Sequence, residues 1–294
     1  MKMNRLPRFI IVFLLVLFMP VKAFCQNEVL IGLIPEENIF NQMERYRPLA
    51  AYLSSKLGIN VKLTILSRYG DIIDRFKARG MDGAFFGVFT GVLAMEKLGV
   101  EPIARPVNLD GTSTVNSLIF VRKDSGIKNV KDMKGKRIAF VDRATVTGYL
   151  YAIAFLRDKG VKDIDRYFKE YYFTGSHDSA IYSVLDNRAD IGSAKSKVYQ
   201  RMIEKDPVIK DELTIIARSS EFPDTTLCLR KGLPAGIKAR IKAILLNMDK
   251  EPEGREVLRR LRALRFVAAS RNDFLPFFEL ARKTGINLKR YRYK

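Results

Sequence analysis

Histidine and cysteine are nearly absent from this sequence of 294 residues, which holds one histidine and two cysteines. Two cysteines are too few for a disulfide-rich scaffold, and with a single histidine they do not supply a Cys/His zinc site. A Ser–His or Cys–His hydrolase would have to be built around His177. We therefore expect a binding protein rather than an enzyme, with no metal and no cofactor.

Long apolar runs are also scarce, and the one present lies near the N-terminus. Three basic residues among the first eight precede an apolar run over 9–19, about half of the roughly 20 residues that a membrane-spanning helix needs. Val21 and Ala23 then place small residues before a signal-peptidase site. We interpret 1–23 as a cleaved signal peptide, so the mature protein should be soluble and exported. A retained membrane anchor and a lipid on Cys25 are the alternatives.

The rest of the chain has a globular composition with an excess of positive charge. Hydrophobic residues make up 47% and charged residues 29%, which excludes a disordered chain, a collagen and a polytopic membrane protein. The net charge is +20, and residues 255–294 hold twelve basic residues against three acidic ones. A predicted helix there has one apolar face, made of Val257, Leu258, Leu261 and Leu264. The basic segment is either a solvated face or a contact for anionic lipid or a membrane-bound partner.

Short apolar strands alternate with helices through most of the chain. The predicted strands are 29–34, 61–66, 83–86, 137–141 and 171–174, and the predicted helices are 46–57, 72–78, 92–98, 148–159 and 178–185. This alternation is typical of βαβ units and of parallel sheets covered on both faces.

Two extended segments, 115–122 and 225–230, run into polar turns instead of helices. They bracket the middle βαβ set, as expected if the chain crosses to a second lobe and returns. We predict two α/β lobes with mixed, mainly parallel sheets joined by a two-strand hinge. The first lobe comprises 28–118 and 224–294, and the second comprises 119–223. Ligands of open α/β sheets bind beyond the carboxyl ends of the strands, so the site should lie between the lobes.

Hydroxyl groups gather at two strand-to-helix junctions of the second lobe, 142–148 and 174–178. The unpaired N–H groups at a helix N-terminus favour an anion. The field of the helix end should keep His177 neutral, as an N–H donor. Threonines at such positions are also ordinary helix caps, and a histidine there can simply pack its helix. The two junctions together indicate a shared oxyanion pocket.

The residues of the second junction, TGSHDSAIYSVLDNRADIG, resemble the segment shared by substrate-binding proteins of ABC transporters for phosphate, phosphite and phosphonates. IGLIPEEN, RYRPLAAYLSSKLGINV, DGAFFGVFTGVLA, KDMKGKRIAFVD, EFPDTTLCLRKGLP and EGREVLRRL resemble the same family in the same order. The resemblance covers nearly the whole mature chain. It implies a type II periplasmic binding protein fold, with two lobes that close on the ligand.

The resemblance also implies which residues bind the ligand. The hydroxyl-rich anion loop of the family falls on Thr145, Val146 and Thr147, its histidine on His177, and a closing hydroxyl of the first lobe on Thr90. Phe40 and Phe89 follow strand ends and are candidates for apolar walls of the pocket.

Four positions depart from the pattern of the family. Gly91 stands where many phosphonate binders carry an aromatic residue, and it should leave space. Lys195 and Lys197 stand where acidic or neutral polar residues are common, and Arg143 replaces a proline. Lys195 argues against a ligand that carries an ammonium group. We predict a multiply anionic or bulkier ligand that contacts Lys195, although a solvated surface lysine is the alternative.

The leading hypothesis is a periplasmic, monomeric receptor that closes on a small phosphorus oxyanion and delivers it to an ABC permease. The alternative is a sensory module that reports a ligand to a membrane kinase or cyclase. An enzyme is less favoured because His177 and Asp178 are neighbours on one helix and point about 100° apart. The sequence has no recognised nucleic-acid motif, so nucleic acid is not an expected partner.

Overall fold

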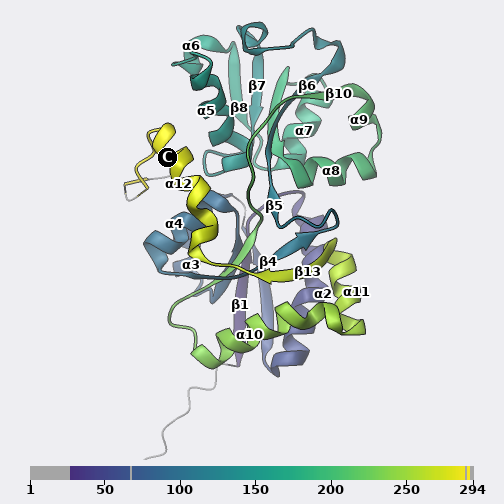
Figure 1. Ribbon diagram of the computed structural model, residues 1–294, viewed down its shortest axis with the longest axis vertical. Helices are drawn as coiled ribbons and strands as arrows, with labels where there is room; N and C mark the ends of the chain where they lie inside the picture. Colours follow the sequence, from purple (N-terminus) through teal and green to yellow (C-terminus); the bar gives the residue numbers. More distant parts are fainter. Residues whose placement is uncertain (1–26, 67, 289, 292–294) are drawn as a thin grey trace, which may run out of the picture.

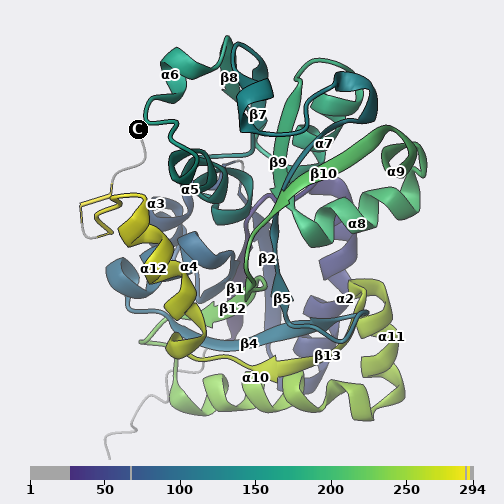
Figure 2. The same ribbon diagram turned by 45° about the horizontal axis from the view of Figure 1, so that its top comes forward.

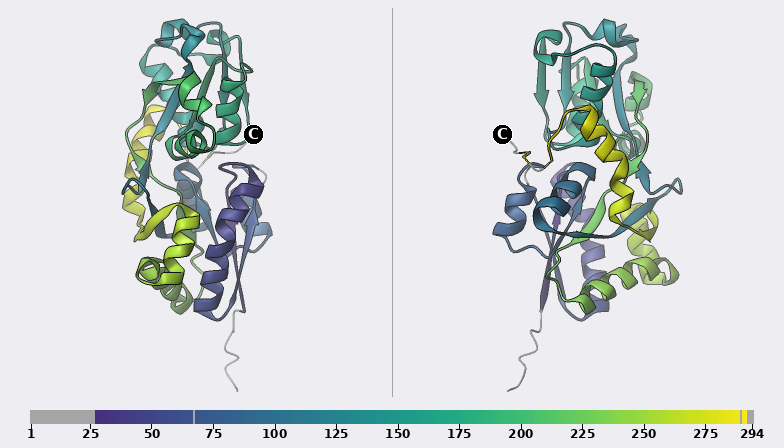
Figure 3. Two further views of the ribbon diagram at one scale, coloured as in Figure 1. Left: turned by 90° about the vertical axis from the view of Figure 1, so that its right-hand side faces the viewer. Right: turned by 60° about the vertical axis from the view of Figure 1, so that its left-hand side comes forward.

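The computed structural model describes residues 27–66, 68–288 and 290–291. The predicted signal peptide, 1–23, and Cys25 lie outside these residues. Within them, no helix is both long and apolar enough to cross a bilayer. The chain forms two lobes, stacked one above the other in Figure 1 and seen from the sides in Figure 3.

Each lobe is built on one mixed sheet. The lower sheet has the strand order β13-β4-β12-β3-β1-β2 and the upper sheet the order β10-β6-β9-β7-β8. The lower strands are β1 (Glu28–Leu33), β2 (Asn60–Ile65), β3 (Gly83–Phe86), β4 (Glu101–Asn108), β12 (Thr226–Leu229) and β13 (Ala263–Ala268). The upper strands are β6 (Ser117–Arg122), β7 (Arg137–Phe140), β8 (Glu170–Phe173), β9 (Ile191–Lys195) and β10 (Leu213–Arg218).

Helices cover both faces of each sheet (Figure 1). On the lower sheet, one face packs against α2 (Ile39–Leu57), α10 (Ala235–Asn247) and α11 (Pro252–Leu261), and the other against α3 (Ile72–Ala78), α4 (Val88–Leu98) and α12 (Leu275–Lys283). On the upper sheet, one face packs against α5 (Tyr151–Asp158) and α6 (Ile164–Tyr167), and the other against α7 (His177–Leu185), α8 (Ser196–Lys205) and α9 (Val208–Glu212).

The chain crosses between the lobes through a small sheet in which β5 (Thr114–Val115) pairs with β11 (Phe222–Pro223). The strands next to the crossing enter the large sheets antiparallel to their neighbours, β6 beside β9 and β12 beside β3. Among the strands that the structure describes, parallel pairing is confined to β2-β1-β3 and β8-β7-β9. The periodicity of a strand does not reveal its direction, so the prediction of mixed sheets is confirmed while their parallel part is smaller than predicted.

Local signals explain where several elements begin and end. α2 starts at Ile39 because the side chain of Asn38 accepts hydrogen bonds from the first N–H groups, and it ends at Gly58 in the left-handed conformation. α11 ends at Leu261, where Arg262 takes a φ of 59°. Leu264 therefore lies in β13, 46% exposed, and the prediction that it shares a helix face with Val257 is wrong.

Candidate functional site

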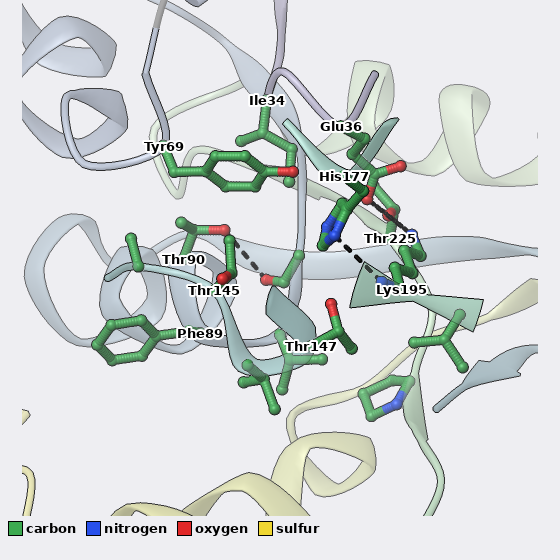
Figure 4. Close-up of a pocket in the computed structure, with 16 residues that line it drawn as sticks. Ile34, Glu36, Tyr69, Phe89, Thr90, Thr145, Thr147, His177, Lys195 and Thr225 are labelled. Atoms are coloured by element: carbon green, nitrogen blue, oxygen red, sulfur yellow. Dashed lines mark hydrogen bonds and ion pairs between the residues drawn. The ribbon is translucent and has the colours of Figure 1, made fainter. Parts of the chain in front are cut away.

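A small cavity lies between the lobes, at the carboxyl ends of β1, β3, β7 and β9 (Figure 4). Its polar lining consists of Glu36, Tyr69, Thr90, Thr145, Thr147, His177, Lys195 and Thr225, with Ile34, Phe89 and Val146 among the apolar residues. Its volume is about 30 Å³. One water needs about 10–15 Å³ by this measure, so the cavity suits a compact group of a few atoms.

The loop after β7 presents backbone donors to this cavity. Asp142 holds the loop: its carboxylate accepts the Ala144 N–H at 2.7 Å, and its carbonyl accepts the Thr145 hydroxyl at 2.7 Å. The following turn, Val146–Leu150, is a π-helical start of α5. The first N–H groups of a helix have no intrahelical acceptor, so those of Val146 and Thr147 remain for an anion. The Thr145 hydroxyl already donates to the loop and has to turn before it can donate to a ligand.

Close packing of Gly148 fixes the position of this loop. A Cβ atom at Gly148 would lie 2.5 Å from side-chain atoms of Val141, closer than such atoms approach in proteins. The Gly148 carbonyl accepts a hydrogen bond from the Val141 N–H at 3.1 Å. The helix start is therefore held against the end of β7, which aims the first N–H groups into the cavity.

His177 begins α7 and is buried, with 2% of its surface exposed. The Lys195 N–H donates to Nδ1 at 3.1 Å, so the proton of a neutral imidazole lies on Nε2. Burial is the main cause that lowers the pKa of His177, to about 3. The sequence predicted a neutral ring because of the field of the helix end, whereas in the structure burial is the main cause of the neutral ring.

Tyr69 is a polar residue of the site that sequence reasoning missed. It is 2% exposed, and its hydroxyl has no hydrogen-bond partner among the residues that the structure describes. The ring meets His177 edge-on with 6.2 Å between centroids, and Figure 4 shows the hydroxyl in the cavity with the His177 ring and the Thr145 and Thr147 hydroxyls. Burial raises the pKa of Tyr69 well above its usual value, so it is a neutral donor. Its place after β2 was the only signal in the sequence.

The structure brings most of the predicted site residues together but not all of them. Phe89 lines the cavity and packs against Phe277 with ring centroids 5.2 Å apart. Phe40 lies on the outer side of the first turn of α2, 74% exposed, and forms no wall of the cavity. The space expected at Gly91 is filled, because a Cβ atom there would lie 3.2 Å from the ring of Phe274.

Lys195 is buried at the end of β9, 5% exposed, so the alternative of a solvated surface lysine is wrong. Its ammonium contacts Glu36, Asp224 and Thr225. Lys197 lies outside the cavity and pairs with Asp110. Among the described residues, no group of three or more histidine, cysteine, aspartate or glutamate side chains is arranged to hold a metal ion.

Comparison with known proteins identifies the family of this chain. Residues 31–274 match the family described as ABC transporter, phosphonate, periplasmic substrate-binding protein. The chain belongs to that family. It is therefore a component of an ABC transporter and not an enzyme, and the prediction of the family and fold is confirmed.

The individual relatives are distant. The phosphonates-binding periplasmic protein of Escherichia coli K12 is 25% identical over 85% of this chain and 75% of its own length. A probable phosphite-binding protein of an ABC transporter from Prochlorococcus marinus MIT 9301 is 24% identical over 86% of this chain and 88% of its own. The 1.52 Å resolution structure of the Prochlorococcus protein in complex with methylphosphonate, 24% identical in sequence, superposes with a TM-score of 0.79 over 88% of this chain and 98% of that one, which shows the shared fold.

Proposed function

We propose that this member of the family closes on a small phosphorus oxyanion, such as phosphite or methylphosphonate, and delivers it to a permease in the inner membrane. The observation that carries the proposal is the unpartnered hydroxyl of Tyr69 beside the Nε2–H of His177 and the helix start at Val146. These groups are all donors. Relatives named for phosphonates and phosphite support the same ligand class.

Neutral donors set the character of the proposed site. Among the described residues that line the cavity, Lys195 is the only cationic one, and its charge is already paired with Glu36 and Asp224. The anion is therefore met by dipoles and by N–H and O–H groups, which is the arrangement expected for an anion at a helix N-terminus. The small volume supports a ligand with little or no organic substituent, contrary to the bulkier ligand that Gly91 suggested.

Tyr69→Phe tests the site because it removes one hydroxyl and keeps the ring. A hydrogen bond to a charged group contributes about 1.5–3 kcal/mol, so the dissociation constant should rise roughly 10-fold to 150-fold. Isothermal titration calorimetry of the mature protein with phosphite, phosphate, methylphosphonate and sulfate provides the measurement. Tyr182→Phe is the matched control, since Tyr182 is 37% exposed on α7 and lies outside the cavity. Equal affinity in wild type and Tyr69→Phe would contradict the proposed site, and no binding of any phosphorus oxyanion by wild type would contradict the function.

A further inference from the structure

The amine of Lys195 is enclosed by oxygen atoms of other segments of the chain. Its Nζ lies 2.7 Å from Glu36 Oε1, 2.7 Å from Asp224 Oδ1 and 2.7 Å from Thr225 Oγ1. The side chains of Lys195, Glu36 and Asp224 are each 5% or 6% exposed. An ammonium group has three N–H donors, and these three acceptors use all of them. Lys195 therefore has no donor left for an anion in this arrangement.

Glu36 and Lys195 are both charged at neutral pH. Burial opposes ionisation of Glu36, but Lys195 and Thr225 outweigh it and lower the pKa of this carboxyl to about 2. Burial likewise opposes the charge on Lys195, and the two carboxylates outweigh it and raise the pKa of the amine. Two carboxylates thus surround one ammonium, which is why a lysine can be tolerated at this depth.

The oxygen atoms around Lys195 Nζ form the kind of site that would bind the ammonium group of a ligand. Two carboxylate oxygens and one hydroxyl around a nitrogen match the needs of a ligand ammonium, which is stable inside a protein only when it is paired and hydrogen-bonded. The position adjoins the proposed oxyanion site, because the backbone N–H of Lys195 holds His177 at 3.1 Å.

Space for a ligand arm lies on both sides of the lysine. Glu36, Lys195 and Thr225 line the oxyanion cavity, and they also line a second small cavity that Arg45 and Asp224 border. Because Lys195 lines both cavities, we expect removal of its side chain to connect them, with the carboxylates of Glu36 and Asp224 at the junction.

We propose that Lys195 is a specificity-determining residue, a tethered cation that fills an ammonium site beside the oxyanion cavity and thereby excludes amine-bearing phosphonates. The proposal rests on the proposed function for the identity of the oxyanion, but not for the ammonium site itself. A lysine at this position therefore restricts the ligands to phosphorus oxyanions that carry no amine.

Two substitutions separate the charge of the lysine from its volume. Lys195→Ala vacates the ammonium position, whereas Lys195→Met removes the charge and keeps the space filled. We expect 2-aminoethylphosphonate to bind Lys195→Ala at least about 10-fold more tightly than it binds wild type, with no such gain in Lys195→Met. Propylphosphonate, which carries a methyl group in place of the ammonium, should gain less in Lys195→Ala. Calorimetric titration of the three proteins with both ligands measures these differences.

Ethylammonium chloride tests the ammonium site without any phosphorus ligand. It should raise the melting temperature of Lys195→Ala more than sodium chloride of equal concentration does, and leave wild type and Lys195→Met unchanged. If Lys195→Ala gains neither amine, the inference is overturned even where wild type binds phosphite. If ethylammonium stabilises Lys195→Ala while no phosphorus oxyanion binds any of the proteins, the ammonium site stands and the proposed function fails. Should Lys195→Ala not fold, Lys195→Ser, which also vacates the ammonium position and keeps both carboxylates, takes its place in both experiments.

Discussion

At the scale of single residues, protonation states decide what the cavity can do. Neutral His177 donates through Nε2 because Nδ1 accepts from the backbone of Lys195. Tyr69 stays protonated because burial raises its pKa, and Glu36 stays ionised because Lys195 lowers its pKa against the effect of burial. The donors thus face the cavity, while at its edge the ammonium of Lys195 is paired with the carboxylates of Glu36 and Asp224.

The pH dependence of stability follows from His177. Its pKa is about 3 in the folded protein against an ordinary value of 6.5, so the unfolded chain binds the proton more readily. The free energy of unfolding should therefore fall as pH drops below about 6.5, with a slope approaching 1.4 kcal/mol per pH unit from this residue. His177→Asn keeps an acceptor and does not titrate, so its slope should be smaller by about that amount.

Urea unfolding at pH 7, 6 and 5, without phosphate in the buffer, measures the two slopes. Glu36 does not contribute strongly in this range. Its pKa is lowered from 4.5 to about 2, so the stability that it adds is present above about pH 4.5 and is lost only as pH falls toward 2. Parallel curves for wild type and His177→Asn would show that His177 can be protonated in the folded protein.

At the scale of elements, α12 joins the lobes beside the β5–β11 crossing (Figure 2), and the turn Arg271–Phe274 that leads into it contacts β11. Phe277 is fully buried among residues of both lobes, including Phe89 of α4 and Ala154 of α5. The Arg157 side chain of the upper lobe donates to the Thr284 carbonyl, just after α12, at 2.7 Å. The buried face of α12 is therefore part of the core, and the helix belongs to the basic segment that begins at Arg255. Several of its basic residues are paired, Arg259 and Arg260 with Glu256, and Arg271 with Glu96.

Phe277→Ala should consequently destabilise the protein by about 3–5 kcal/mol, the usual cost of removing a fully buried phenylalanine side chain. Leu275→Ala, on the same helix, removes a side chain that is 58% exposed and should change the free energy of unfolding by less than about 0.5 kcal/mol. Chemical denaturation of both variants gives the comparison. Similar small effects at the two positions would mean that α12 does not dock on the lobes in solution.

At the scale of the whole molecule, the loop 36–38 of the lower lobe holds the upper lobe. The Asn38 N–H donates to Asp178 Oδ2 at 2.8 Å, and the His177 N–H donates to the Glu36 carbonyl at 3.1 Å. Glu37 adds an ion pair with Arg201 of α8 at 3.5 Å. These contacts join the lobes through the protein's own groups, so part of the free energy of closure does not depend on the ligand.

Arg201→Met should favour the open form without touching the oxyanion cavity, whose lining does not include Arg201. Glu37 keeps its partner Arg45 at 2.5 Å, so the variant leaves no carboxylate unpaired. The side chains of this pair are only 16% and 10% exposed, so its loss should cost at least the roughly 1 kcal/mol of an exposed pair. The apparent affinity should therefore be at least about fivefold weaker, because ligand binding must then supply the lost closure energy. Small-angle scattering without ligand should show a larger radius of gyration, which saturating ligand restores. Arg47→Met, which breaks the exposed pair with Glu44, is the control and should change neither quantity.

The sequence by itself determined the local features of this protein. Apolar periodicity located most strands and helices, since that signal lies within a few residues. The hydroxyls and helix starts at 145–147 and 177 were visible for the same reason, and the quoted segments were enough to reveal the family. Cys228 lies in β12 and is 0% exposed, as the apolar residues around it in the sequence indicate.

Only the tertiary structure decided the rest. Lys195 meets Glu36 across 159 positions of sequence, and no local pattern marks the two as partners. The buried hydroxyl of Tyr69, the filling of the Gly91 space by Phe274 and the antiparallel entry of β6 and β12 likewise depend on how distant segments meet. Charge pairing and cavity size are properties of the contact between lobes, whereas periodicity and helix capping are properties of the chain itself.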